Sequence, residues 1–171
     1  MGATVVAAAS TPEKAALAER HGADRSFVYP AGPFDKEGRK ALAASFKAAV
    51  GGDGAQVIYD PVGGDYAEAA LRAIAWEGRF LVVGFPAGIP APPLNLTLLK
   101  GCDVCGVFWG AFVARQPQAH LENTAELMAL YAQGKLRPEV SQVYPFAQAA
   151  EAITALAERR ALGKVVVRVR P

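Results

Sequence analysis

Few side chains in this sequence belong to types and spacings that carry out metal, redox or acid–base chemistry. Cys102 and Cys105 form a C-x-x-C pattern, which elsewhere binds a metal or exchanges electrons. The pair falls in a run expected to be a strand, where positions three apart face opposite sides of the sheet. A shared metal or redox centre is therefore disfavoured, and we expect two buried thiols.

The histidines and the neighbouring carboxylates suggest no catalytic group either. His21 is expected at the end of a helix and His120 on an exposed helix face, and the chain has no other histidine. Asp60 and Asp65 flank a turn and do not resemble an acid/base pair. We assign no metal ligand and no catalytic side chain.

Composition narrows the class of protein. With 171 residues, of which 52% are hydrophobic and 20% charged, the chain is expected to fold as one domain over residues 1–171. The net charge of +2 is not gathered into a run of like charges, so binding to nucleic acid or an anionic membrane through bulk charge is not expected. No membrane-length apolar stretch and no signal peptide is seen, which predicts a cytoplasmic protein.

Short apolar runs alternate with alanine-rich helical segments, which is typical of an α/β fold with a mostly parallel sheet. The run at residues 3–9 is apolar on both faces, as in a strand at the middle of a sheet. Ser10 is expected to cap the following helix. Strands are expected at residues 3–9, 26–29, 56–60, 79–85, 103–109 and 164–169, and helices at about 10–22, 35–50, 66–76, 118–133 and 146–160.

Five segments, in this order and spacing, resemble the nucleotide-binding half of the NADPH:quinone oxidoreductases, a family of the medium-chain dehydrogenase/reductase superfamily. They read YDPVGG (59–64), AL…WEGR (70–79), VGFPAGIP (83–90), LLKG…GVFWG (98–110) and GKVVV (163–167). The resemblance covers essentially the whole chain. It implies a Rossmann-like, doubly wound sheet of strand order 3-2-1-4-5-6, with the dinucleotide at the carboxyl ends of the strands.

The chain departs from that family at its start. The resemblance begins at the family's second strand, so the first strand, the Gly-x-Gly-x-x-Gly loop, its helix and the preceding catalytic domain are missing. Gly51-Gly52-Asp53-Gly54 is no substitute, because it precedes a strand and does not open a helix. We expect an incomplete Rossmann-like sheet.

The missing strand would lie between residues 4–8 and 57–59, and we call this position the slot. An empty slot exposes two strand edges, where each buried unsatisfied group costs on the order of 1 to 3 kcal/mol. We therefore expect either a fragment of a longer enzyme or a slot closed by something else. The candidates are a rearranged sheet, the strand at 165–167, or a partner chain.

The end of the first expected strand bears on the choice of cofactor. It reads Ala9-Ser10-Thr11, with Lys14 one turn later and no carboxylate at the strand end. An acidic residue there would bind the ribose hydroxyls of NADH, whereas small polar and basic residues favour the 2′-phosphate of NADPH. By resemblance, Ser10, Lys14 and Tyr29 hold that phosphate. The alternatives are that Ser10 only caps a helix and that Lys14 is a solvated surface lysine.

The resemblance also assigns the rest of a cofactor site. Val62 and Gly63 are placed near the adenine-side ribose, and Arg159 near the phosphates. The residues placed near the nicotinamide are Val83, Gly84, Phe85, Phe108 and Trp109. Structural alternatives remain for three of these groups. Phe108 and Trp109 also suit a core or interface pair, residues 62–63 an ordinary turn, and Arg159 a charge beside a helix C-terminus.

The resemblance implies an NADPH-dependent oxidoreductase that passes a hydride to a quinone or an activated enone without zinc. It also implies a homodimer formed by pairing the edge strand at residues 103–109. Because the diphosphate loop is missing, we expect the isolated chain to bind NADPH more weakly than millimolar, or not at all, and to show little activity.

The alternative function is a non-enzymatic assembly or regulatory module. A methyltransferase would need an acidic residue at the first strand end and a glycine loop before it, and neither is present.

Overall fold

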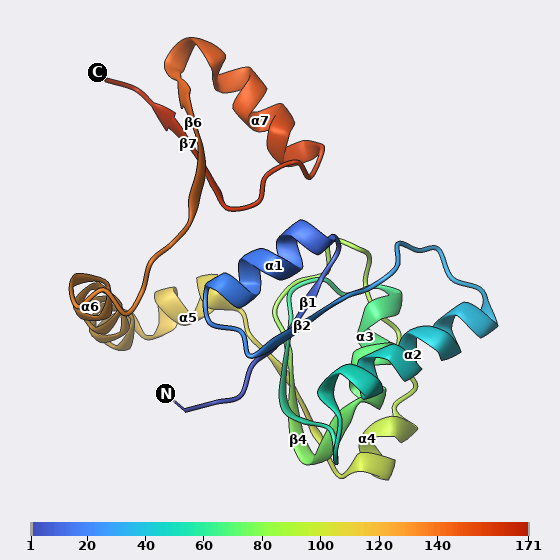
Figure 1. The fold of residues 1–171 in the computed structure, drawn as a ribbon. Coiled ribbons are helices and arrows are strands. Elements are labelled where there is room, and N and C mark those ends of the chain that lie inside the picture. Colours follow the sequence, from blue (N-terminus) through green and yellow to red (C-terminus); the bar gives the residue numbers. More distant parts are fainter. Residues whose placement is uncertain (1, 171) are drawn as a thin grey trace. The chain divides into compact units, whose positions relative to one another are not determined.

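The computed structural model describes residues 2–170, which divide after Arg115 into two compact units (Figure 1). The first unit holds β1 (Val6–Ala9), α1 (Pro12–Arg20), β2 (Arg25–Val28), α2 (Lys36–Val50), β3 (Ala55–Asp60), α3 (Asp65–Arg72), β4 (Ile74–Val82), α4 (Asn95–Lys100), β5 (Asp103–Gly106) and α5 (Trp109–Arg115). The second holds α6 (Pro117–Ala132), β6 (Val140–Pro145), a 3₁₀ turn η1 (Phe146–Gln148), α7 (Ala149–Ala157) and β7 (Lys164–Arg168).

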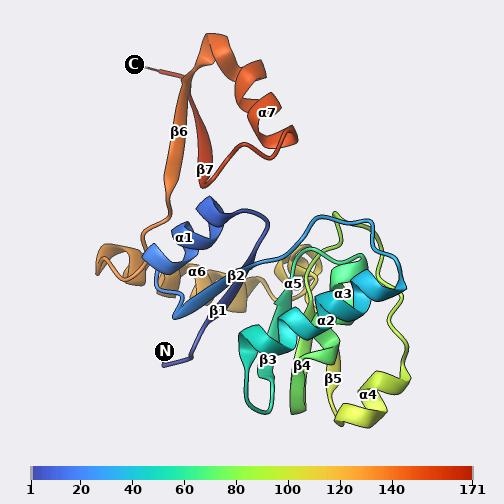
Figure 2. The same cartoon turned by 45° about the vertical axis from the view of Figure 1, so that its right-hand side comes forward.

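Every strand pair in the described chain is parallel, so the expected α/β class is confirmed. In the first unit, β1 pairs with β2, and β3, β4 and β5 form a second sheet in that order (Figure 2). In the second unit, β6 pairs with β7. Parallel strands need helical crossovers, and α1, α3 and α4 supply them in the first unit.

The two sheets of the first unit match the expected incomplete Rossmann-like sheet. β1 and β3 each keep one edge without a partner strand among the described residues. The strand at residues 164–168 pairs with β6, so it does not close the slot, and the described strands show no rearranged single sheet. The Tyr59 side chain of β3 is 64% exposed.

α2 connects the two sheets of the first unit through its apolar face. Phe46 packs against the core formed by Leu71, Ile74 and Phe80, and its ring stands edge-on to Phe27 of β2, with centroids 4.9 Å apart. Leu42, one turn earlier on the same face, is fully buried. This i, i+4 spacing puts both side chains on one face of α2, by which a single helix packs against both sheets.

The expected boundary between the third helix and the fourth strand is wrong. The helix expected to reach residue 76 ends at Arg72, and Ile74 begins β4 by pairing with Ala55. Alanine-rich LRAIAW suits a helix locally, but the pairing with β3 makes Ile74 a completely buried strand residue. Gly78 is a strand residue of β4, and a Cβ there would come within 2.7 Å of the Ile74 side chain.

The cap of α1 lies one residue later than expected. Thr11, not Ser10, is the N-cap, because its hydroxyl accepts a hydrogen bond from the Lys14 N–H at 3.3 Å, and Pro12 occupies the first turn. Both hydroxyls suit a cap, so local sequence does not separate them. Ser10 is exposed.

The end of the expected strand at 103–109 is also corrected. β5 ends at Gly106, and Trp109 begins the short helix α5, which the sequence did not predict; β6 was not predicted either. Cys102 lies just before β5 and Cys105 within it, and both thiols are free and half-buried instead of fully buried.

Candidate functional site

The carboxyl end of β3 is organised by one buried carboxylate. Asp60, the last residue of the strand, is 7% exposed, and its Oδ1 accepts hydrogen bonds from the N–H groups of Val62 at 2.9 Å and Gly63 at 3.0 Å. A carboxylate can be buried when hydrogen bonds compensate for the loss of water, and two backbone N–H groups do so here. Asp60 therefore fixes the turn that carries the predicted residues Val62 and Gly63, a role that sequence reasoning missed.

The loops after β3 and β4 are held together at this end. The Gly64 N–H donates to the Gly88 carbonyl at 2.8 Å, and the Ala87 N–H donates to the Val62 carbonyl at 3.0 Å. Gly63 has φ +71°, and a Cβ on it would lie 2.7 Å from the Phe85 Cβ. Only glycine permits both this backbone conformation and this approach.

The predicted residues Val83, Gly84 and Phe85 continue from the same strand end. The N–H groups of Val83 and Gly84 both donate to the Asp60 carbonyl, at 3.0 and 3.3 Å. Gly84 is half-buried, whereas the ring of Phe85 is 52% exposed. The structure thus brings together Val62, Gly63, Val83, Gly84 and Phe85 at one edge of the sheet.

Phe108 and Trp109 stand at the carboxyl end of the next strand. The Val107 N–H donates to the Val82 carbonyl at 2.8 Å, so the chain leaves β5 beside the end of β4. Phe108 is 79% exposed, and Trp109 stacks against Phe112 with centroids 5.4 Å apart. In the described chain these aromatic side chains are therefore not core residues.

Ser10, Lys14 and Tyr29 gather at the carboxyl ends of β1 and β2. The Tyr29 N–H donates to the Ala9 carbonyl at 3.0 Å, directly before Ser10, and Lys14 is half-buried in the first turn of α1. The Tyr29 ring lies 4.8 Å, centroid to centroid, from the ring of Tyr66 at the start of α3. Tyr66 in turn donates from its hydroxyl to the Pro30 carbonyl at 3.1 Å.

These tyrosines show how the two strand ends are related. Tyr29 follows β2 and Tyr66 follows β3, so the carboxyl ends of the two sheets lie on the same side of the first unit. In doubly wound folds that is the side on which ligands bind. Tyr66 was not singled out from the sequence, because no local pattern shows which helix start a distant tyrosine contacts.

Arg159 lies in the second unit, just after α7, with a left-handed φ of 58°. Its N–H donates to the Leu156 carbonyl at 3.0 Å, so its backbone helps to end that helix. Its role near the phosphates of a cofactor stays a prediction.

The residues at the β1 end fit the ribose phosphate of a dinucleotide better than its diphosphate. Ser10 is exposed, and the carboxylate of Glu13 is engaged locally: its own backbone N–H and the Thr11 hydroxyl lower the pKa of Glu13. The Gly63-Gly64 turn opens α3, with Gly64 as its N-cap, but it does not have the Gly-x-Gly-x-x-Gly pattern. The first turn of α3 carries Asp65 and Glu68, which repel a diphosphate.

The described residues do not fit a zinc ion. Across positions 2–170 no group of three or more His, Cys, Asp or Glu side chains lies close enough to hold a metal. In the same part of the chain, no helix is long and apolar enough to span a membrane.

Comparison with known proteins supplies the family. The family model described as zinc-binding dehydrogenase matches residues 21–167. Quinone oxidoreductase-like protein 2 of Bos taurus is 32% identical over 166 residues, which is 96% of this chain and 45% of the relative. Quinone oxidoreductase of Pseudomonas aeruginosa is 32% identical over 170 residues, 98% of this chain and 49% of the relative.

A solved structure agrees with these relatives. The mycobacterial protein Rv1454c complexed with NADPH superposes with a TM-score of 0.81 at 27% identity, over 98% of this chain and 50% of that one. The chain thus spans about half the length of the proteins it matches.

Proposed function

The chain belongs to the zinc-binding dehydrogenase family, and from that membership we propose that it is the NADPH-binding portion of a quinone oxidoreductase-like enzyme. The complete enzyme would pass a hydride from NADPH to a quinone or an activated enone. The relatives named as quinone oxidoreductases and the neighbour solved with NADPH support this proposal.

The observation that carries the proposal is the locked pair of loops at the carboxyl edge of β3 and β4. Gly63 against Phe85, and Gly64 against Ala87, leave room for backbone only. Such close packing sets a rigid surface at the carboxyl ends of β3 and β4, and the rings of Phe85 after β4 and Phe108 after β5 are exposed. A dinucleotide that runs from Ser10 to Phe108 would cross the point at which the strand order reverses.

We assign the described residues to two parts of the cofactor. Ser10, Lys14 and Tyr29 would bind the 2′-phosphate, through a hydroxyl, an ammonium group and a phenol. Val83, Gly84, Phe85, Phe108 and Trp109 would line the nicotinamide end, and Val62 and Gly63 would lie near the adenine-side ribose. When bound, NADPH supplies the hydride, and these side chains orient it without a catalytic acid, base or zinc.

The slot and the missing diphosphate loop limit what this chain does alone. The three longest helices of the first unit are each acidic in the first turn, with Glu13 in α1, Glu37 in α2 and Asp65 in α3. We propose that the chain by itself binds NADPH more weakly than millimolar, and that a strand and glycine loop added at the slot restore binding. Homodimerisation through β5, the outer strand of its sheet, is part of the same proposal.

A chimera tests the function directly. The half of the Pseudomonas aeruginosa relative that lies outside the match is joined to this chain, and NADPH oxidation is followed by absorbance with 1,4-benzoquinone as acceptor. We expect turnover by the chimera and none by the chain alone. A chimera that folds by circular dichroism but neither binds nor oxidises NADPH would overturn the assignment.

The same experiment addresses the second candidate, a non-catalytic assembly module. That candidate is favoured by the absence of a diphosphate-binding loop among the described residues. It predicts a chimera that folds and associates, as seen by light scattering, without binding NADPH.

A further inference from the structure

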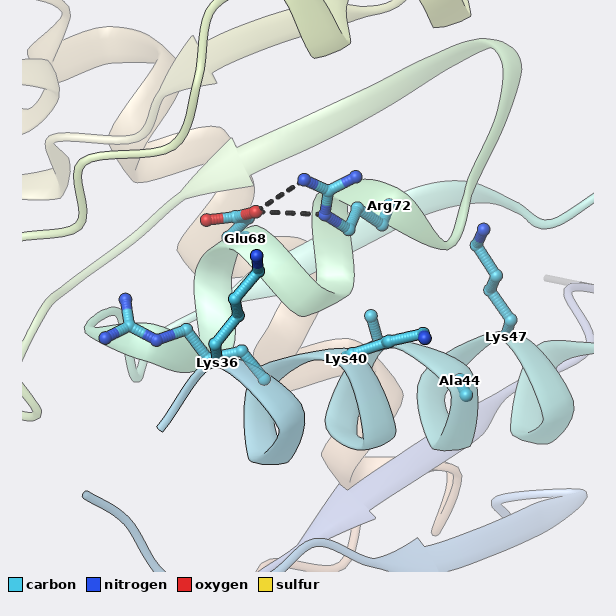
Figure 3. A pocket seen from close by; sticks show the side chains of 8 residues that line it. Lys36, Lys40, Ala44, Lys47, Glu68 and Arg72 are labelled. Carbon is cyan, nitrogen blue, oxygen red and sulfur yellow. Dashed lines mark hydrogen bonds and ion pairs between the residues drawn. The ribbon is translucent and has the colours of Figure 1, made fainter. Parts of the chain in front are cut away.

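A basic groove of about 630 Å³ lies between α2 and α3 (Figure 3). Five cationic side chains line it: Lys36, Arg39, Lys40 and Lys47 from α2, and Arg72 from α3. Of the described residues that line the groove, Glu68 is the only acidic one. The chain as a whole has a net charge of only +2, so the groove is a local concentration of positive charge.

The two arginines are held in place by acids on α3. Arg72 donates from Nε and Nη2 to the Glu68 Oε1, at 2.9 and 2.7 Å, and the Arg39 Nη1 lies 3.4 Å from the Asp65 Oδ1. Each of these arginines therefore has an acidic neighbour. Lys36, Lys40 and Lys47 have no acidic partner within 4 Å among the described residues, so their charge is available to a ligand.

The three lysines form a row along one face of α2. An α-helix rises 1.5 Å per residue with 3.6 residues per turn, so positions 36, 40 and 47 lie nearly in line and span roughly 16 Å. Figure 3 shows Lys40 and Lys47 on this helix beside the Glu68–Arg72 pair of its neighbour. A row of this length suits an extended ligand with repeated negative charges better than one compact anion.

The walls of the groove narrow the chemistry of the ligand. Its apolar lining consists of the methyl groups of Ala43 and Ala44, with no aromatic side chain among the described lining residues. Proteins that bind nucleic acid single strands stack bases on aromatic rings, and protein partners are usually anchored by buried aromatic or large apolar groups. A ligand that needs only charge and hydrogen bonds fits these walls.

We propose that this groove binds a linear chain of phosphoryl groups, as in inorganic polyphosphate. Lysine ammonium groups meet the phosphoryl oxygens along the row, and Arg72, already oriented by Glu68, donates from its remaining nitrogen. The site shares no residue with the surface assigned to NADPH. It goes beyond the proposed function, and either proposal can fail without the other.

Isothermal titration calorimetry on the full chain tests the site, with tripolyphosphate, a longer inorganic polyphosphate and orthophosphate as probes. We expect affinity to rise with chain length and to fall steeply between 50 and 200 mM salt, because the ligand displaces counterions. Orthophosphate that binds as tightly as the longer chain would overturn the proposal.

Two variants with the same change in net charge distinguish binding at the groove from attraction to the overall charge of the protein. The triple variant Lys36→Gln, Lys40→Gln, Lys47→Gln should weaken polyphosphate binding at least tenfold. The control Lys100→Gln, Lys135→Gln, Lys164→Gln removes the same charge elsewhere and should change binding less than twofold. Equal losses in both, with circular dichroism unchanged, would mean bulk attraction and would overturn the site.

A variant that binds more tightly provides a test that misfolding cannot mimic, because misfolding would only weaken polyphosphate binding. Glu68→Gln removes the acidic side chain of the groove and should strengthen polyphosphate binding severalfold. Glu37→Gln, on α2 outside the groove, is its control and should have little effect. No gain in Glu68→Gln relative to Glu37→Gln would count against the groove as the binding site.

Discussion

Gly63 and Phe85 approach so closely that a Cβ on Gly63 would stand 2.7 Å from the Phe85 Cβ and 2.8 Å from its Cα. These residues belong to the turn after β3 and the loop after β4, and the contact fixes one loop against the other. The hydrogen bond from Ala87 to Val62 runs beside it. Two loops at the carboxyl edge of the sheet therefore behave as one rigid surface, on which the proposed cofactor site depends.

Gly63→Ala tests this contact. The variant combines a positive φ with a collision against Phe85, so we expect a loss of about 2 to 4 kcal/mol in the free energy of unfolding. The control is Gly52→Ala, at φ +48° with nothing within 4 Å of an added Cβ, which should lose only about 1 to 2 kcal/mol. Urea unfolding measures both, and equal losses would show that φ alone matters.

Replacing Asp60 tests the anchor of the turn. Asp60→Ala leaves the N–H groups of Val62 and Gly63 without their acceptor in a buried place, and should cost about 2 to 3 kcal/mol. Asp60→Asn keeps one carbonyl oxygen and should cost less. If thermal unfolding ranks the two variants in the opposite order, the turn is not held by this acceptor.

Glu13 makes stability depend on pH at low pH. Its own backbone N–H and then the Thr11 hydroxyl bond the carboxylate and lower the pKa of Glu13 below its ordinary value of 4.5. The charged form is favoured by folding, so this stabilisation is present above about pH 4.5 and is lost as the pH falls through the lowered pKa.

Glu13→Gln removes that dependence. The melting temperature of the variant should converge on that of the unsubstituted chain as the pH falls from 6 to 3, whereas Glu19→Gln serves as a control on the same helix. A gap between Glu13→Gln and the unsubstituted chain that widens toward acid pH would contradict the assignment.

Ser10→Asp tests which dinucleotide the chain prefers. In the chimera with the Pseudomonas aeruginosa half, a carboxylate at position 10 would repel the 2′-phosphate and accept from a ribose hydroxyl. We expect kcat/KM with NADPH to fall by about tenfold, with NADH unchanged or improved. An equal loss with both cofactors would place position 10 outside the phosphate site.

Hydrogen exchange tests the unpaired strand edges. β4 lies between β3 and β5, so its amides should be the most protected in the first unit. Amides of β1 and β3 that have no strand partner should exchange much faster, because no backbone acceptor shields them. Uniform protection across β1, β3 and β4, measured by NMR, would show that something covers these edges in solution.

Local signals in the sequence were sufficient for the class of fold and most of its elements. Alternation of apolar runs with alanine-rich segments predicted the parallel strands, and residues 62–63 were expected to form a turn after β3. Two-sided apolarity at residues 3–9, together with the absent glycine loop, also predicted the slot, which the described strands leave open. Strands, helices and turns depend on residues that are close together in the sequence, so periodicity and composition predict them.

Other features were decided by tertiary structure, because they depend on contacts between distant segments. Pairing with Ala55 made Ile74 a strand residue against its helical surroundings, and only the fold brought Tyr29 to Tyr66. The spacing of Lys36, Lys40 and Lys47 in the sequence places them on one face of a helix. The groove itself exists only because α3 packs beside that helix and Glu68 orients Arg72. Sequence spacing places side chains on a face, whereas packing determines what that face meets.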